Sequence, residues 1–159
     1  VALVAEAVGS RGMVGGQMED LEATGQVAGE EAGPASRLER IHAAKTGCLL
    51  RASVEAGAVL AGVDDETRRR FADYGTRLGL AFQVADDILD ATATAEELGK
   101  SPGKDAAAGK LTYVTLYGLE QARGRLAELE VEMVMLAGEL EGTGGPLADI
   151  ARYVARRKS

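Results

Sequence analysis

The sequence predicts an all-α protein, and three observations support this prediction. Apolar residues recur at helical spacing along nearly the whole chain, and no sustained alternation of apolar and polar residues is present. Aromatic residues make up only 4% of the 159 residues, so a core must be built mainly from Ala, Leu, Val and Ile. This composition favours helices over strands. We expect residues 1–159 to form a single domain, since the length suffices for one core.

Stretches rich in glycine and proline separate the expected helices. The first helix covers about residues 1–22 and ends before the turn-forming segment ATGQVAGEEAGPAS. The second covers about residues 37–61, with Ser36 as a possible N-cap, and ends at Gly62. The positions of this helix that we expect to face the core are Ile41, Ala44, Cys48, Leu49, Ala52 and Val59.

Two long helices and a short one complete the expected bundle. The third helix covers about residues 66–92 and follows the possible cap residues Asp64 and Asp65. The glycine-rich segment LGKSPGKDAAAGK comes next, and a fourth helix covers about residues 111–140. After GTGGP, a short amphipathic helix begins at Pro146, because proline fits the first turn of a helix. The chain then ends with the basic residues Arg156, Arg157 and Lys158.

Charge and composition exclude several classes of protein. A formal net charge of -7 argues against a sequence-independent nucleic-acid binder, which needs a basic face. The single cysteine, Cys48, cannot form an internal disulfide, and the single histidine, His42, leaves no Cys/His set for zinc. No apolar run approaches the length of about 20 residues that a membrane span requires. We therefore expect a cytoplasmic protein without a membrane span, and the apolar start at Val1 indicates a piece of a longer chain.

Three aspartates lie on the otherwise apolar segment FQVADDILD, residues 82–90. In a helix Asp86 and Asp90 share one face, about 6 Å apart along the axis, whereas Asp87 lies about 100° around it. Such a partly buried group of like charges requires a nearby cation, and no Lys or Arg lies three or four residues away on the same helix. One interpretation is a solvated or salt-bridged acidic face. The other is a Mg²⁺ site, because Mg²⁺ prefers carboxylate oxygens, waters and phosphate oxygens.

Lysines in two other segments could contact a phosphate. Lys45 lies in the largely apolar segment IHAAKTGCLL, next to the hydroxyl of Thr46. Gly47 in the middle of a helix costs about 1 kcal/mol relative to alanine unless a close approach or a kink is needed. The glycine-rich segment after the aspartate helix contains Lys100, Lys104 and Lys110. Taken singly, each lysine is also explained by a solvated surface charge.

Four stretches of the chain resemble the trans-type polyprenyl diphosphate synthases. They are, in order, GMVGGQMED (12–20), IHAAKTGCLLRASVEAGA (41–58), YGTRLGLAFQVADDILD (74–90) and LGKSPGKDAAAGKLTYVTLYGLEQAR (98–123). The chain is most similar to the C-terminal part of bacterial farnesyl or geranylgeranyl diphosphate synthases. This resemblance implies the C-terminal half of an antiparallel helical bundle of the isoprenoid synthase type. It also implies isoprenoid biosynthesis, by Mg²⁺-dependent head-to-tail condensation of isopentenyl diphosphate with an allylic diphosphate.

The resemblance also implies roles for individual residues. The residues implied as Mg²⁺ ligands, forming the second aspartate-rich motif of the family, are Asp86, Asp87 and Asp90. Those implied as catalytic are Lys45, Thr46, Gln83 and Lys100. Those implied in substrate binding are Gln17, Asp20, Lys110 and Arg157. The terminal basic residues resemble a tail that closes over the site in some members of the family.

The first aspartate-rich motif and the isopentenyl diphosphate pocket of the family have no counterpart in this sequence. DDETRRR, residues 64–70, is no substitute, because Arg68 stands where the last aspartate belongs, and a helix N-cap followed by a basic turn explains it. We therefore expect little or no synthase activity from the isolated chain. Activity would require the missing N-terminal half or a partner subunit, and we expect a homodimer when the protein is complete. Alternatives are a non-catalytic partner subunit of a heteromeric prenyl synthase, a terpene cyclase, and a helical bundle without a ligand.

Overall fold

The computed structural model describes residues 1–23, 33–92, 110–142 and 144–157. Regular secondary structure in these ranges is entirely helical, which confirms the all-α prediction. The elements are α1 (Ala2–Val8), α2 (Met13–Ala23), α3 (Gly33–His42), the π-helical segment η1 (Ala43–Gly47), α4 (Cys48–Leu60), α5 (Asp65–Thr92), α8 (Tyr113–Tyr117), α9 (Leu119–Glu141) and α10 (Pro146–Arg156). None of the described helices is long and apolar enough to cross a membrane.

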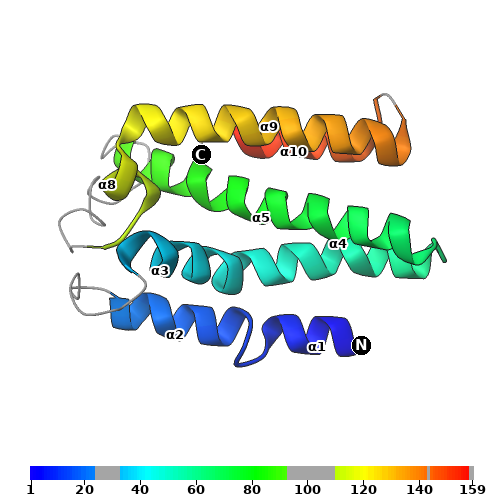
Figure 1. The fold of residues 1–159 in the computed structure, drawn as a ribbon, viewed down its shortest axis with the longest axis horizontal. Coiled ribbons are helices and arrows are strands. Elements are labelled where there is room, and N and C mark those ends of the chain that lie inside the picture. Colours follow the sequence, from blue (N-terminus) through cyan, green and yellow to red (C-terminus); the bar gives the residue numbers. More distant parts are fainter. Residues whose placement is uncertain (24–32, 93–109, 143, 158–159) are drawn as a thin grey trace.

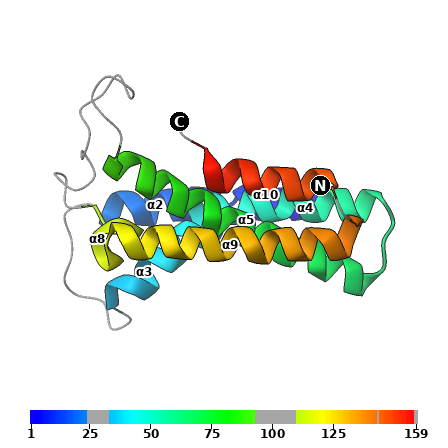
Figure 2. The same ribbon diagram turned by 90° about the horizontal axis from the view of Figure 1, so that it is seen from above.

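The long helices lie along one common direction in successive tiers (Figure 1). α1 and α2 form the first tier, α3 to α4 the second, α5 the third, and α9 with α10 the last. The chain reverses direction between α4 and α5 and again between α9 and α10, so the two helices joined by each of these turns are antiparallel (Figures 1 and 2). The ends of α2 and α5 and the beginnings of α3 and α9 therefore lie at the same end of the bundle, together with α8.

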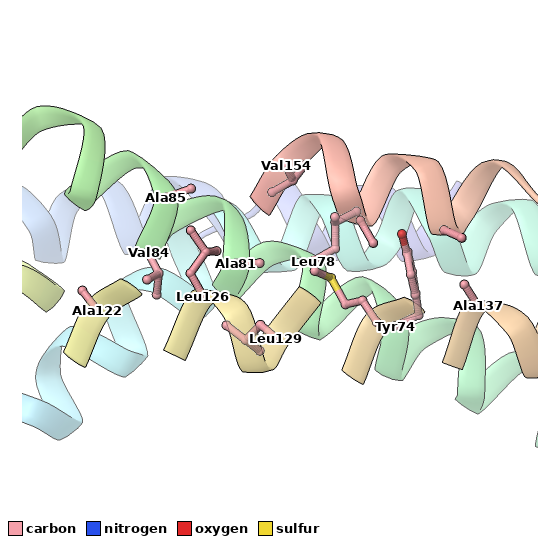
Figure 3. Packing of buried hydrophobic residues seen from close by; sticks show 13 residues of the cluster. Tyr74, Leu78, Ala81, Val84, Ala85, Ala122, Leu126, Leu129, Ala137 and Val154 are labelled. Carbon is pink, nitrogen blue, oxygen red and sulfur yellow. The ribbon is translucent and has the colours of Figure 1, made fainter. Parts of the chain in front are cut away.

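The main hydrophobic core lies between α5, α9 and α10 (Figure 3). Small side chains such as Ala81 and Ala122 are completely buried there, so the helices can pack closely around the few large ones. The largest completely buried side chain belongs to Tyr74, whose hydroxyl donates a hydrogen bond to the carbonyl oxygen of Leu147 at 2.7 Å. This bond satisfies the polar end of the tyrosine and joins α5 to the first turn of α10.

The turn between α4 and α5 confirms the predicted helix start. The side-chain oxygen Oδ1 of Asp64 accepts a hydrogen bond from the backbone N–H of Thr67 at 2.7 Å, which is an N-cap. Arg68 lies 3.3 Å from the buried carboxylate of Glu55 on α4. The segment DDETRRR therefore starts α5, and its Arg68 joins α5 to α4 through the ion pair with Glu55.

The boundaries of three predicted helices differ in the structure. The first is interrupted between Val8 and Met13 and forms α1 and α2. The second begins at Gly33, so that Ser36 lies inside α3 and does not cap it. The fourth is divided at Gly118, whose φ of +85° is a left-handed conformation that favours glycine. Of the expected core positions in the second helix, Val59 was wrong, because it is 53% exposed near the end of α4.

Candidate functional site

The π-helical segment η1 lies between α2 and α5, and two glycines allow this close packing. A Cβ atom on Gly16 of α2 would lie 2.2 Å from the backbone nitrogen of Lys45. A Cβ atom on Gly79 of α5 would lie 2.6 Å from the Cα atom of Gly47. Gly47 thus occupies a place of close helix approach, as its position in the sequence indicated. Single π turns inside α-helices are frequent at functional sites, and this one carries Lys45 and Thr46.

Lys45 and Asp20 form an ion pair that connects η1 to the end of α2. The Nζ atom of Lys45 donates a hydrogen bond to Oδ2 of Asp20 at 2.6 Å. Asp20 is buried and the lysine side chain is partly exposed, so the pair is shielded from water on the aspartate side. The structure therefore brings together two residues that the resemblance assigned to the site.

Asp87 is buried and faces α3 and α8. Its Oδ2 atom accepts a hydrogen bond from the backbone N–H of Tyr113 at 2.6 Å and lies 3.6 Å from Nε2 of His42. Burial lowers the pKa of His42 to about 4, with a further lowering by Lys110 and Lys45 that Asp20 opposes. The imidazole is therefore neutral at pH 7. In the sequence analysis we assigned no site role to His42. Its position three residues before Lys45 was the available signal, because residues three apart in a helix lie on the same side.

Asp86 points to another side of α5 and pairs with Arg157, the residue that follows α10. The guanidinium of Arg157 contacts the carboxylate of Asp86, donates to the carbonyl oxygen of Phe82 at 3.2 Å, and lies 4.1 Å from the centre of the Phe82 ring. The cation that Asp86 requires in this structure thus comes from the far end of the sequence. Burial raises the pKa of Asp86, whereas Arg157, Lys110 and Lys45 act in the opposite direction.

We expect replacement of Arg157 by alanine to lower the free energy of unfolding by about 1 kcal/mol, because a desolvated cation–π contact and an ion pair are both lost. Thermal unfolding followed by circular dichroism would measure this change. Arg152→Ala is the matched control on α10, since Arg152 pairs with the exposed Asp149 of its own helix and such pairs contribute little. Equal losses in the two variants would contradict the assignment of Arg157 as a stabilising contact.

The remaining predicted residues are distributed around this end of α5. Asp90 is half-buried one turn after Asp86, and Gln83 is half-buried one turn before Asp87. Thr46 is half-buried beside Lys45, whereas Gln17 is exposed on α2. Lys100 lies outside the described residues, as do Lys104 and Lys158. Within the ranges that the structure describes, no group of three His, Cys, Asp or Glu side chains is placed so that it could hold a metal ion.

The fold defines the class of protein. One solved structure with the same helical arrangement is a geranyltransferase from Helicobacter pylori, complexed with magnesium and isoprenyl diphosphate, with a TM-score of 0.74 and 30% identity. The match covers 96% of this chain and 48% of that one. A heptaprenyl diphosphate synthase from Staphylococcus aureus has a TM-score of 0.80, over 99% of this chain and 59% of that one, and at 20% identity it supports the fold alone. The shared architecture is that of the all-α prenyl diphosphate synthases.

The sequence comparison names the family. Residues 1–136 match the family described as polyprenyl synthetase, and this chain belongs to that family. A chloroplastic geranylfarnesyl diphosphate synthase from Leucosceptrum canum is 43% identical over 97% of this chain and 42% of that protein. A dimethylallyltranstransferase from Fischerella ambigua is 40% identical over 99% of this chain and 44% of that protein. The chain thus spans less than half the length of these curated relatives.

Proposed function

We propose that this chain is the C-terminal part of a prenyl diphosphate synthase and supplies the half of the active site that binds the allylic diphosphate. The observation that supports this proposal best is the charge arrangement at the end of α5. Asp86 and Asp90 share one face there, and the charges of Lys45 and Lys110 both act on Asp86. Carboxylates that can bind a metal ion, together with lysine charges that act on them, suit a metal ion bound with a diphosphate.

The donor chemistry of these residues fits Mg²⁺. Two carboxylates on one helix face offer the hard oxygen ligands that Mg²⁺ prefers, and Mg²⁺ normally keeps several waters and takes further oxygens from phosphate groups. Asp86 would have to exchange its contact with Arg157 for the metal ion. The neighbouring guanidinium would then be available to the diphosphate.

The proposed reaction is the head-to-tail condensation of isopentenyl diphosphate with an allylic diphosphate. Loss of diphosphate from the allylic substrate leaves a carbocation, so the developing negative charge on the leaving group must be stabilised. Bound Mg²⁺ would supply part of that positive charge. Lys45 and Lys110 would supply more from the protein, while Thr46 and Gln83 would offer hydrogen bonds that orient the diphosphate. Lys100 is proposed for the same role on the strength of the resemblance.

The proposal includes the rest of a longer protein. The chain would form one domain with the remaining part, which would contribute the pocket for isopentenyl diphosphate, and the complete protein would be a cytoplasmic homodimer. A second candidate function is a non-catalytic subunit that pairs with a longer synthase, and the coverage of only 42% of a curated relative favours it. Copurification of this chain with a separate catalytic subunit would support this second candidate, whereas an aspartate-rich motif encoded upstream in the same gene would exclude it.

The diphosphate site is tested by binding. We expect the chain to bind inorganic pyrophosphate in the presence of MgCl₂ in isothermal titration calorimetry, and Asp86→Asn to weaken this binding by about tenfold or more, because one charged ligand is lost. Asp149→Asn is the control, since Asp149 is an exposed aspartate on α10 that pairs with Arg152. Binding that is independent of Mg²⁺, or equal in Asp86→Asn and the parent, would defeat the proposed function.

A further inference from the structure

We infer that Asp87 is a positioning residue and not a metal ligand: it anchors the start of α8, and with it the backbone of Lys110, against α5. This inference rests on the proposed function, since it divides the roles of the three aspartates in the same site. It differs from what the resemblance implied, which was the same Mg²⁺-binding role for all three. The argument depends on where the three side chains lie around α5 and on what Asp87 contacts.

The three aspartates have different surroundings. The side chain of Asp87 is 10% exposed, whereas that of Asp86 is 48% exposed. Asp87 lies about 100° around α5 from Asp86 and about 60° from Asp90, so its position on the helix alone does not separate it from them. Its surroundings do, because the buried carboxylate lies against α3 and α8, and a metal ion on the exposed side of Asp86 would reach it only if these contacts changed.

The carboxylate of Asp87 also has a structural partner. Its Oδ2 atom accepts the backbone N–H of Tyr113, the first residue of α8, at 2.6 Å. A buried N–H without an acceptor is costly, so this bond fixes the start of α8 to α5. Nε2 of His42, on α3, lies 3.6 Å from the same oxygen, so α3 also covers the carboxylate of Asp87. These two contacts hold the carboxylate of Asp87 toward α3 and α8.

The segment that Asp87 holds carries Lys110, three residues before Tyr113. Between them, Thr112 is buried and caps α8 by a reciprocal pair of hydrogen bonds with Thr115. The hydroxyl of Thr115 also donates to the carbonyl oxygen of Lys110 at 3.4 Å, so the same cap holds the backbone of Lys110. Lys110 is half-buried, and its charge acts on both His42 and Asp86. Anchoring the amide of Tyr113 to α5 therefore also limits the movement of the Lys110 backbone relative to α5.

Hydrogen exchange of the Tyr113 amide tests the anchoring directly, with variants of Asp87 and a control variant of Asp86. Asp87→Ala removes the acceptor, and we expect the amide of Tyr113 to exchange about tenfold faster or more, measured by NMR or by mass spectrometry of the peptide that contains it. Asp87→Asn keeps an acceptor oxygen of the same shape, so we expect protection close to that of the parent chain. Asp86→Asn should leave this amide unchanged. Unchanged protection in Asp87→Ala, or in Asp87→Leu if the alanine variant does not fold, would overturn the inference, because neither side chain can accept the hydrogen bond.

Binding of inorganic pyrophosphate with MgCl₂ separates positioning from metal ligation. We expect Asp87→Asn to retain an affinity within about threefold of the parent chain, whereas Asp86→Asn loses about tenfold or more. An equal loss in both variants, with the Tyr113 amide still protected in Asp87→Asn, would show that Asp87 is a ligand and would overturn the inference. If the parent chain binds no Mg²⁺ and pyrophosphate, the proposed function fails, and the exchange of the Tyr113 amide alone then decides the anchoring.

Discussion

Replacing Gly16 with alanine is expected to lower the free energy of unfolding by about 3 kcal/mol or more, the upper part of the range for overpacked cores. The new Cβ atom would lie 2.2 Å from the backbone nitrogen of Lys45 and 2.7 Å from its Cα atom. Backbone atoms cannot rotate aside as the end of a side chain can, so α2 and η1 would have to separate. Urea unfolding of the two chains, followed by circular dichroism, would measure the difference.

The control for this substitution is Gly124→Ala. Gly124 lies in α9, and a Cβ atom there would have no neighbour within 4 Å among the described residues outside its own helix backbone. Alanine is the better helix former, so this variant should gain about 0.5–1 kcal/mol. Opposite signs in the two variants would show that backbone approach, and not glycine content, determines the result. A Gly16→Ala variant as stable as the parent chain would refute the close packing of α2 on η1.

Loss of this packing should also affect the site. Lys45 reaches Asp20 because η1 and the end of α2 lie against each other, and the ion pair measures 2.6 Å. A separation of the two backbones by even the width of a methyl group would lengthen that pair or break it. The glycine on α2 therefore serves the site indirectly, through the position of a lysine on another helix.

The sequence was sufficient to predict the elements whose signals are local. The helix over 66–92 was predicted within one residue of α5, because its cap at Asp64 and its helical periodicity both belong to one short stretch. The helix from Pro146 was also correct, since proline at a first turn follows directly from its fixed φ. The break at Gly118 was missed, because apolar periodicity continues on both sides and only the chain path requires the positive φ.

The features that the sequence could not supply depend on contacts between distant segments. The pairing of Asp86 with Arg157 joins residues that are 71 positions apart, and no local pattern predicts it. The different surroundings of Asp86 and Asp87 have the same origin, since adjacent identical residues differ only in the helices that each one faces. The motif therefore predicted where the acidic group lies, while tertiary packing determines what each carboxylate contacts.

Replacing Met133 with alanine is expected to cost about 2–5 kcal/mol of unfolding free energy, as for large apolar side chains removed from a core. Met133 is completely buried on α9, within the core cluster that includes residues of α5 and α10, so the substitution leaves a cavity between those helices. Met135→Ala is a matched control, since Met135 is 64% exposed on the same helix and should change stability by no more than about 0.5 kcal/mol. Both substitutions change helix propensity by the same amount, so the difference between their urea midpoints measures packing alone. Equal midpoints would mean that Met133 does not pack against α5 and α10.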